Sequence, residues 1–171
     1  MARTGWAPRG LAAAMTLAGA LVSTSALAEQ FKCPKVGGDF VFGQEANVNS
    51  LDQMTSTTIS TRNVAMNIFE ALMARDENNN PITDLAESYT ESPDGLVYTF
   101  KLRPGVKFHN GKAMTSADVV ASWDRYKRVA AERQILDNVA KWEAPDASTF
   151  VVTMKKRQPT FIEFISSFSQ P

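Results

Sequence analysis

The sequence has little of what catalytic and metal sites are built from, with one cysteine and one histidine among 171 residues. Metal ligands and nucleophile–base pairs depend mainly on these two residue types. No Cys-x-x-Cys, no paired-histidine motif and no Gly-x-Ser-x-Gly elbow occurs. His109 lies in a predicted turn beside Asn110-Gly111, which favours a solvated residue. We therefore expect no metal, no cofactor and no enzymatic activity, and we expect Cys33 to be a free thiol or to pair outside this chain.

A net charge is also missing, since 18 basic residues balance 18 acidic ones. Without the first 28 residues, which contain Arg3 and Arg9, 16 basic residues remain against 18 acidic ones. Nucleic-acid-binding domains carry a basic excess on one face. The basic triplet Lys155 to Arg157 ends a predicted strand and is typical of a solvated strand end. We expect no nucleic-acid partner.

Long apolar runs are missing except near the N-terminus. The run from Leu11 to Val22 is too short to span a membrane, and two arginines precede it. Ala26-Leu27-Ala28 then offers a cleavage site of the small-x-small type. The pattern predicts a signal peptide over residues 1–28, cleavage between Ala28 and Glu29, and a periplasmic location for the mature protein.

The most informative stretch runs from Ser92 to Val120. Asp94-Gly95 favours the left-handed backbone of a tight hairpin turn. Apolar and polar residues then alternate, which predicts a strand with one buried face. That face carries Leu96, Tyr98, Phe100 and Leu102.

Two turn signals, Pro104-Gly105 and Asn110-Gly111, bound a second and shorter predicted strand, over residues 106–108. Thr115 and Asp118 have the spacing of a capping box, with Asp in place of the usual Glu or Gln. The box predicts a helix that begins at Ser116 and ends near Ala130. Its expected buried residues are Val119, Trp123 and Tyr126.

Upstream, the apolar run over residues 40–42 predicts a strand buried on both faces, as in an α/β sheet. A hydroxyl-rich segment, residues 52–61, follows it and precedes a predicted helix. Free backbone N–H groups at a helix start can receive a polar group of a ligand, although simple N-capping is the alternative. The helix is expected to bury Val64, Ile68 and Leu72.

Downstream, the sequence predicts a short helix over residues 133–139 and a strand that buries Phe150, Val152 and Met154. Trp142 falls in a predicted loop between them. Pro159-Thr160 opens an apolar helix, much of whose surface we expect to remain exposed.

Several of these segments together resemble the peptide-type, family 5 solute-binding proteins of ABC importers. The family pattern is Ala-Glu-Ser-aromatic, Ser-Pro-Asp-Gly, aromatic-Thr-Phe-x-Leu-Arg, Val-Lys-Phe-x-x-Gly and Thr-x-x-Asp-Val-Val. The matching segments are residues 86–89, 92–95, 98–103, 106–111 and 115–120. Five matches in fixed order make the resemblance specific, and it extends from about Gly38 onward.

The resemblance implies an α/β, periplasmic-binding-protein-like fold of type II, two-lobed in full length. Residues 29–65 would begin the main ligand-binding lobe, and residues 66–171 would form an additional mixed subdomain, truncated at its C-terminal end. The expected ligand-binding residues, carried over from the family's cleft loops, are Asn47, Ser56, Thr57, Thr58 and Gln134. Gln53 replaces the proline that usually follows Leu-Asp in this loop.

The function implied is capture of a small solute and its delivery to the membrane permease. The resemblance favours a peptide as that solute. It also implies that the full-length protein is a monomer. Sugars, opines, nickel complexes and haem are also compatible with the resemblance, because fold does not choose among them. Two other classes remain as alternatives. One is an exported hydrolase whose catalytic residues lie outside this chain, and the other is a non-catalytic adhesion or scaffold domain.

Overall fold

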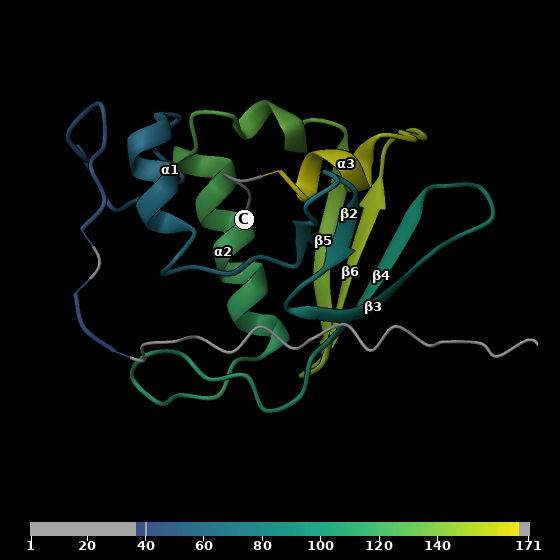
Figure 1. Cartoon of the computed structure of the whole chain (residues 1–171). Helices are drawn as coiled ribbons and strands as arrows, with labels where there is room; N and C mark the ends of the chain where they lie inside the picture. The colour runs from purple at the N-terminus through teal and green to yellow at the C-terminus, as the bar shows by residue number, and fades with distance from the viewer. Residues whose placement is uncertain (1–36, 40, 168–171) are drawn as a thin grey trace, which may run out of the picture. The chain divides into compact units, whose positions relative to one another are not determined.

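The computed structural model describes residues 37–39 and 41–167. The predicted signal peptide, the cleavage site and Cys33 lie outside these residues. The chain divides into two units between Val41 and Phe42, and the second unit contains every helix and strand of the described residues (Figure 1). The description below concerns this second unit.

A four-stranded sheet carries the core of the unit. Its strands are β3 (Ala86–Glu91), β4 (Val97–Leu102), β5 (Val139–Asp146) and β6 (Thr149–Met154). They pair antiparallel in the order β3-β4-β6-β5. Two hairpins, β3–β4 and β5–β6, therefore meet at the central β4–β6 pairing, where Phe100 lies opposite Phe150.

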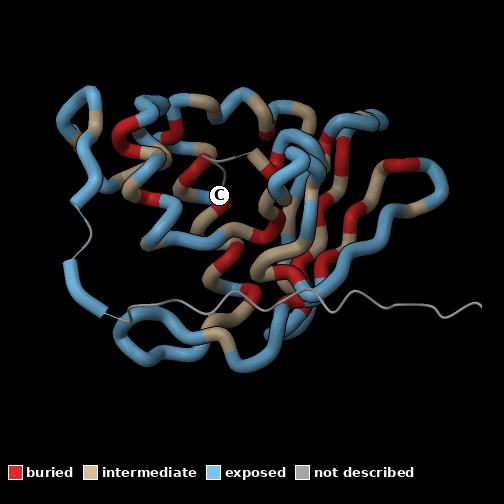
Figure 2. The backbone as a smooth tube through the Cα atoms, viewed as in Figure 1, coloured by how far each residue is buried: buried red, intermediate tan, exposed pale blue. Residues whose placement is uncertain are grey.

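Alternation along the strands decides which face of the sheet is buried. The predicted inner residues of the two central strands are buried, and the residues between them on β4 are half-buried or exposed. Figure 2 shows the buried segments gathered where the strands face the helices. One covered face and one open face is the usual arrangement of an antiparallel sheet. The buried residues are Tyr98, Phe100, Leu102, Phe150, Val152 and Met154.

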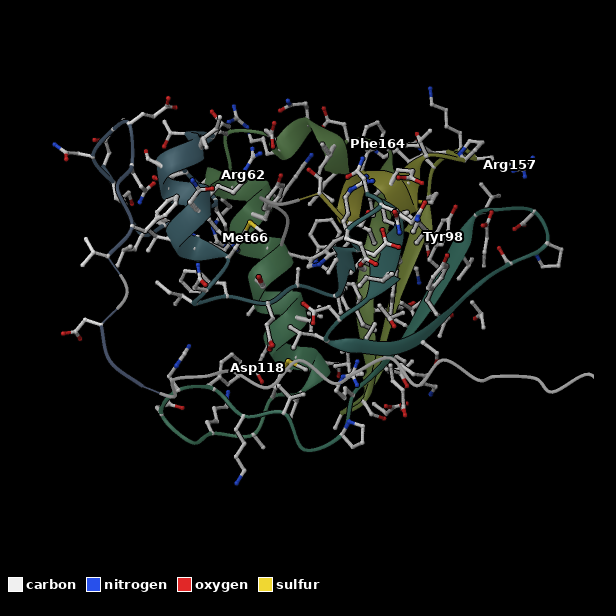
Figure 3. All side chains as sticks on the ribbon, in the orientation of Figure 1. Arg62, Met66, Tyr98, Asp118, Arg157 and Phe164 are labelled. Atoms are coloured by element: carbon white, nitrogen blue, oxygen red, sulfur yellow. The ribbon has the colours of Figure 1, made fainter. Side chains whose placement is uncertain are left out.

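Helix α2 (Ser116–Val129) covers the inner face and buries the three residues that its periodicity predicts. One carboxylate oxygen of Asp118, Oδ2, accepts hydrogen bonds from the Thr115 backbone N–H and hydroxyl, both at 2.9 Å. Asp118 lies at the start of the helix, as Figure 3 shows. The predicted capping box is therefore confirmed, and the helix ends at the expected position, with Ala130 as its C-cap.

Aromatic rings fill the space between α2 and the sheet. The Trp123 ring lies 5.0 Å from Phe150, 5.8 Å from Trp142 and 6.5 Å from Phe161, measured between ring centroids. The loop prediction for Trp142 is wrong, since this residue lies on β5. Pro145 weakens the strand pattern there, but β5 is an edge strand with a bulge between Glu143 and Asp146, and both features accommodate proline.

Two short helices complete the core. The 3₁₀ helix η1 (Arg133–Leu136) buries Leu136. Helix α3 (Phe161–Ile165) buries Phe161 and Ile165 against the same core. The expectation that this helix keeps its apolar surface exposed therefore holds for Phe164, which is 45% exposed, and fails for the two buried residues.

The turn of the first hairpin has the predicted geometry. Gly95 has a φ of 69°, in the left-handed region that favours glycine. The Ser92 hydroxyl donates to the Asp94 carboxylate at 2.6 Å and accepts from the Val97 N–H at 2.8 Å. The shorter strand predicted over residues 106–108 is wrong. Only one isolated bridge, Lys107 to Ala113, forms between the two turns, because the turns leave too few residues for a ladder.

The strand predicted over residues 40–42 is also wrong, as far as it is described. Residues 41 and 42 have no regular structure, and their side chains are 91% and 65% exposed. A strand needs a neighbour for its backbone hydrogen bonds, and no strand within residues 41–167 pairs with this segment.

Helix α1 (Ile59–Ala65) is shorter than its apolar stripe predicts, and of the three residues expected to be buried, Leu72 is buried while Val64 and Ile68 are half-buried. The helix buries Ser60, Thr61 and Ala65, while Ile59 and Met66 are 60% and 52% exposed (Figure 3). The β-branched residues of the segment are weak helix formers, which favours an early end. A turn follows, and Leu72 reaches the core only after it, just before the hairpin of β1 (Met73–Arg75) and β2 (Pro81–Thr83).

Candidate functional site

The loop over residues 50–58 positions most of the predicted ligand-binding residues. The Ser50 hydroxyl accepts a hydrogen bond from the Asp52 N–H at 2.9 Å. The Asp52 carbonyl accepts two more, from the Thr55 N–H at 3.2 Å and the Thr55 hydroxyl at 3.1 Å. These bonds form a local turn, which brings the hydroxyl-rich segment to the start of α1.

Three hydroxyls of this segment satisfy one another. The Thr58 hydroxyl lies 3.0 Å from the Ser56 hydroxyl and donates to the Thr61 hydroxyl at 3.0 Å, and Ser56 also reaches Thr61 at 3.4 Å. Thr61 is fully buried, so the cluster is anchored inside the molecule. Thr58 is the N-cap of α1 but makes no side-chain capping bond. The simple N-capping interpretation of this run is therefore incorrect for Thr58.

Thr57 stands apart from this hydroxyl cluster. Its side chain is exposed, and its hydroxyl makes no hydrogen bond with any residue in the described part of the chain. Thr57 lines an open pocket of about 440 Å³ together with Asn47 and Thr58, so three of the five predicted residues share one pocket. Ser60 also lines it and donates to the Asn47 carbonyl at 3.2 Å, which fixes the distance between the two pocket walls.

Two predicted residues lie elsewhere. Ser56 lines a narrow crevice next to Tyr126, Ala131 and Glu132, and Thr57 lines this crevice as well as the pocket. Gln134 is exposed on η1 and lines neither the pocket nor this crevice. Within the described residues, the predicted set is therefore divided between a pocket and two other places.

The pocket residues outside the predicted set include Glu45 and Asn49. Both belong to the polar connection over residues 44–51, whose richness in amides and carboxylates is the signal that could have found them. The described lining contains one carboxylate, two side-chain amides and several hydroxyls, but no lysine or arginine. Such a lining provides acceptors for a cationic group and donors for a polar uncharged one.

An ion pair joins the loop to α2. The Arg125 guanidinium donates to both carboxylate oxygens of Asp52, at 3.0 Å and 2.6 Å. This pairing lowers the pKa of Asp52 below its usual value and raises the pKa of Arg125. A two-pronged contact of this kind fixes orientation as well as distance.

No group of three or more His, Cys, Asp and Glu among residues 37–39 and 41–167 could hold a metal ion. The His109 ring nitrogen Nε2 lies 3.1 Å from the carbonyl oxygen of Ile68, and the residue is exposed, as a turn residue should be. No helix in the described part of the chain is long and apolar enough to cross a membrane.

Comparison with known proteins defines the class to which this fold belongs. The chain is 31% identical over 159 residues to the glutathione-binding protein GsiB of Escherichia coli K12, an alignment that covers 91% of this chain and 31% of that protein. The solute-binding protein MoaA of A. tumefaciens R10, solved with mannopinic acid, is 35% identical with a TM-score of 0.66, over 71% of this chain and 26% of that one. These are periplasmic-binding-protein-like folds, as the sequence predicts.

A third similar structure is the substrate-binding domain of an oligopeptide ABC transporter from Bacillus anthracis, 30% identical with a TM-score of 0.66, covering 71% of this chain and 27% of that one. The model of the bacterial extracellular solute-binding proteins, family 5, matches residues 80–171. The chain belongs to this family. It spans about a third of the length of the curated relatives it matches.

Proposed function

We propose that this chain is the N-terminal portion of the solute-binding component of an ABC importer, which captures a small solute outside the cytoplasmic membrane and delivers it to the permease. Membership of the solute-binding family supports the proposal. So does the relatives' range of solutes, since the named ones bind glutathione, an opine acid or oligopeptides. Residues 1–28 would be the cleaved signal peptide, residues 29–65 the start of the main lobe and residues 66–171 the additional subdomain.

The observation that carries the proposal is the pocket of about 440 Å³, whose lining combines polar side chains with Ala46 and Ile59. Asn47, Thr57 and Thr58 line it together, and the Thr57 hydroxyl makes no bond with another described residue. A hydroxyl that is positioned but unbonded within the protein can bond a solute with little rearrangement. We infer that these three residues contact the ligand, and that Ser56 supports them through Thr58. Gln134 stays a weaker candidate, because only a rearrangement would bring it to the pocket.

The lining also bears on the ligand class. Glu45 supplies a carboxylate, and none of the other residues lining the pocket is basic. An ammonium group is the natural partner of such a carboxylate, so a peptide with a free amino terminus fits this part of the site better than a neutral sugar. This argument favours peptides among the ligand classes compatible with the family.

A thermal-shift screen of the full-length mature protein tests the function. Peptides, opines, sugars and metal chelates would be compared, each with its N-acetylated form where it has an amino group. A ligand of the native state raises stability by mass action, by about 2.7 kcal/mol at one hundred times its Kd. We expect short peptides to raise the melting temperature and their N-acetylated forms to do so less. A protein stabilised by none of these pools would refute the proposal.

A further inference from the structure

The loop over residues 50–58 is joined to the rest of the protein through the hydroxyl cluster at Thr61, through packing of Met54 against the core, and through Arg125. Besides the ion pair with Asp52, the Arg125 nitrogen Nη1 lies 3.0 Å from the Met54 sulfur. The Met54 carbonyl accepts a hydrogen bond from the Ala131 N–H at 3.0 Å. Three polar contacts therefore join Asp52 and Met54 to α2 and to Ala131, which follows the helix. Arg125 makes two of the three.

We propose that Arg125 is a positioning residue for ligand binding, which holds this loop on α2 so that Thr57 and Thr58 present their hydroxyls to the pocket. Asp52 and Met54 lie at the start of the hydroxyl-rich segment, and Ser56 and Thr57 line a narrow crevice that Tyr126 of α2 also lines. The inference rests on the ligand site proposed above and adds a residue that is 73 positions away in the sequence from the carboxylate it binds.

The rest of α2 makes it a firm support for the loop. Trp123 and Tyr126 lie on either side of Arg125 in the sequence and are 0% and 1% exposed. Both side chains belong to the hydrophobic core, which holds the helix against the sheet. Arg125 itself is 42% exposed in its side chain and Asp52 is 35% exposed. An ordinary surface ion pair contributes little to stability. Loss of this one should therefore change the position of the loop more than the stability of the fold.

The same helix offers a matched control. Lys127 forms an ion pair with Asp137 at 2.5 Å, also at the surface, and neither residue belongs to the loop. Lys127→Gln removes one ion pair from α2 and leaves the loop contacts intact. Arg125→Gln removes the charge and the two-pronged contact, while Arg125→Lys keeps the charge alone. The series separates charge, geometry and the general loss of an ion pair.

Hydrogen exchange of the unliganded, full-length mature protein is the first measurement. The Thr55 amide is bonded inside the loop turn and the Ala131 amide is bonded to Met54, so both report on the docked loop. We expect Arg125→Gln to accelerate exchange about tenfold in the peptide covering residues 52–58 and in the peptide that contains the Ala131 amide, and Arg125→Lys to accelerate it less. Lys127→Gln should leave it unchanged. Unchanged exchange in Arg125→Gln would overturn the inference whether or not a ligand is known.

Affinity is the second measurement, with tri-alanine and reduced glutathione as probes. We expect Arg125→Gln to weaken binding of the better probe about three- to tenfold, with a melting temperature within about 2 °C of the wild type. A loosened loop with unchanged affinity would overturn the positioning role. If the wild-type protein binds neither probe, the preference for peptides fails, and the exchange measurement alone decides whether Arg125 holds the loop.

Discussion

Replacing Thr57 and Thr61 by valine in turn gives a direct test of which hydroxyls serve the ligand and which serve the fold. Valine keeps the shape of threonine and removes the hydroxyl. Thr57 is exposed, lines the pocket and makes no hydrogen bond with the described residues. Its loss should therefore leave the stability within about 0.5 kcal/mol of the wild type. Affinity should fall by about 0.5–1.5 kcal/mol, the net contribution of a neutral hydrogen bond, which is about two- to thirteenfold in Kd.

Thr61→Val should have the opposite profile. The residue is 0% exposed, and its oxygen accepts hydrogen bonds from Thr58 at 3.0 Å and from Ser56 at 3.4 Å. Removal of that acceptor leaves part of the cluster unsatisfied, which should cost about 1–3 kcal/mol of unfolding free energy. Affinity should change less than in Thr57→Val, because Thr61 lies inside the molecule.

Urea unfolding and isothermal titration calorimetry on the same two variants, in the full-length mature protein, decide the matter. The reasoning predicts a crossed result, in which one variant loses affinity and the other loses stability. A Thr57→Val protein with unchanged affinity would show that the pocket does not use this hydroxyl. A Thr61→Val protein as stable as the wild type would show that the hydroxyl cluster does not anchor the loop.

Three further predictions follow from individual contacts. Gly95→Ala should lower the unfolding free energy more than Gly105→Ala, as measured by the urea midpoints of the two variants. Both glycines have a positive φ, a conformation that costs alanine about 1–2 kcal/mol. Of the two, only Gly95 is a position where an added Cβ would meet side-chain atoms, at 2.9 Å. Equal losses would show that the crowding relaxes freely. Asp118→Asn should lower stability at pH 7 by about 1 kcal/mol through loss of the cap and of the Lys112 ion pair. Lys112 lowers the pKa of Asp118 in the folded protein, so this carboxylate stabilises the fold above its unfolded value of 3.8 and loses that effect as pH falls through the folded pKa. Unfolding curves of the two proteins should therefore converge in acid, and a gap that stays constant down to pH 2 would contradict the assignment. Glu45→Gln should weaken the binding of a peptide with a free amino terminus, measured by calorimetry, and should not weaken the binding of its N-acetylated form. An equal effect on both peptides would show that Glu45 does not bind the amino terminus.

The local features of the fold could be predicted because each depends on residues close together in the sequence. The Asp94-Gly95 turn, the alternation of β4 and the capping box of α2 depend on short-range sterics and hydrogen bonds, and the structure confirms all three. The errors arose where long-range partners decide the outcome. Residues 41 and 42 form no strand, because no strand in the described part of the chain pairs with them. Trp142 lies on a strand because Val152 of β6 pairs with it.

The candidate site shows the same division. The hydroxyl-rich composition of residues 52–61 indicated a ligand loop, the family resemblance added Asn47, and three of the predicted residues line one pocket. Composition alone could not separate Thr57 from Thr61, because both are hydroxyls near the start of the same helix and differ in burial; only the family resemblance selected Thr57. Nor could it find Arg125, whose contact with Asp52 depends on the way that α2 packs on the sheet.

The order of the strands has a consequence for the moment at which this domain can form during synthesis. Each hairpin can close as soon as its own turn has emerged, but β4 and β6 are paired across all of α2, η1 and β5. Until Met154 is available, β4 is an edge strand, and the rings of Tyr98 and Phe100 lack the residues opposite them, Val152 and Phe150. A nascent chain that stops anywhere before β6 therefore displays an unpaired apolar strand, the kind of surface that associates with other chains. The core of this unit can therefore close only after β6 has been synthesised, because β4 has no other partner on that edge in the described part of the chain.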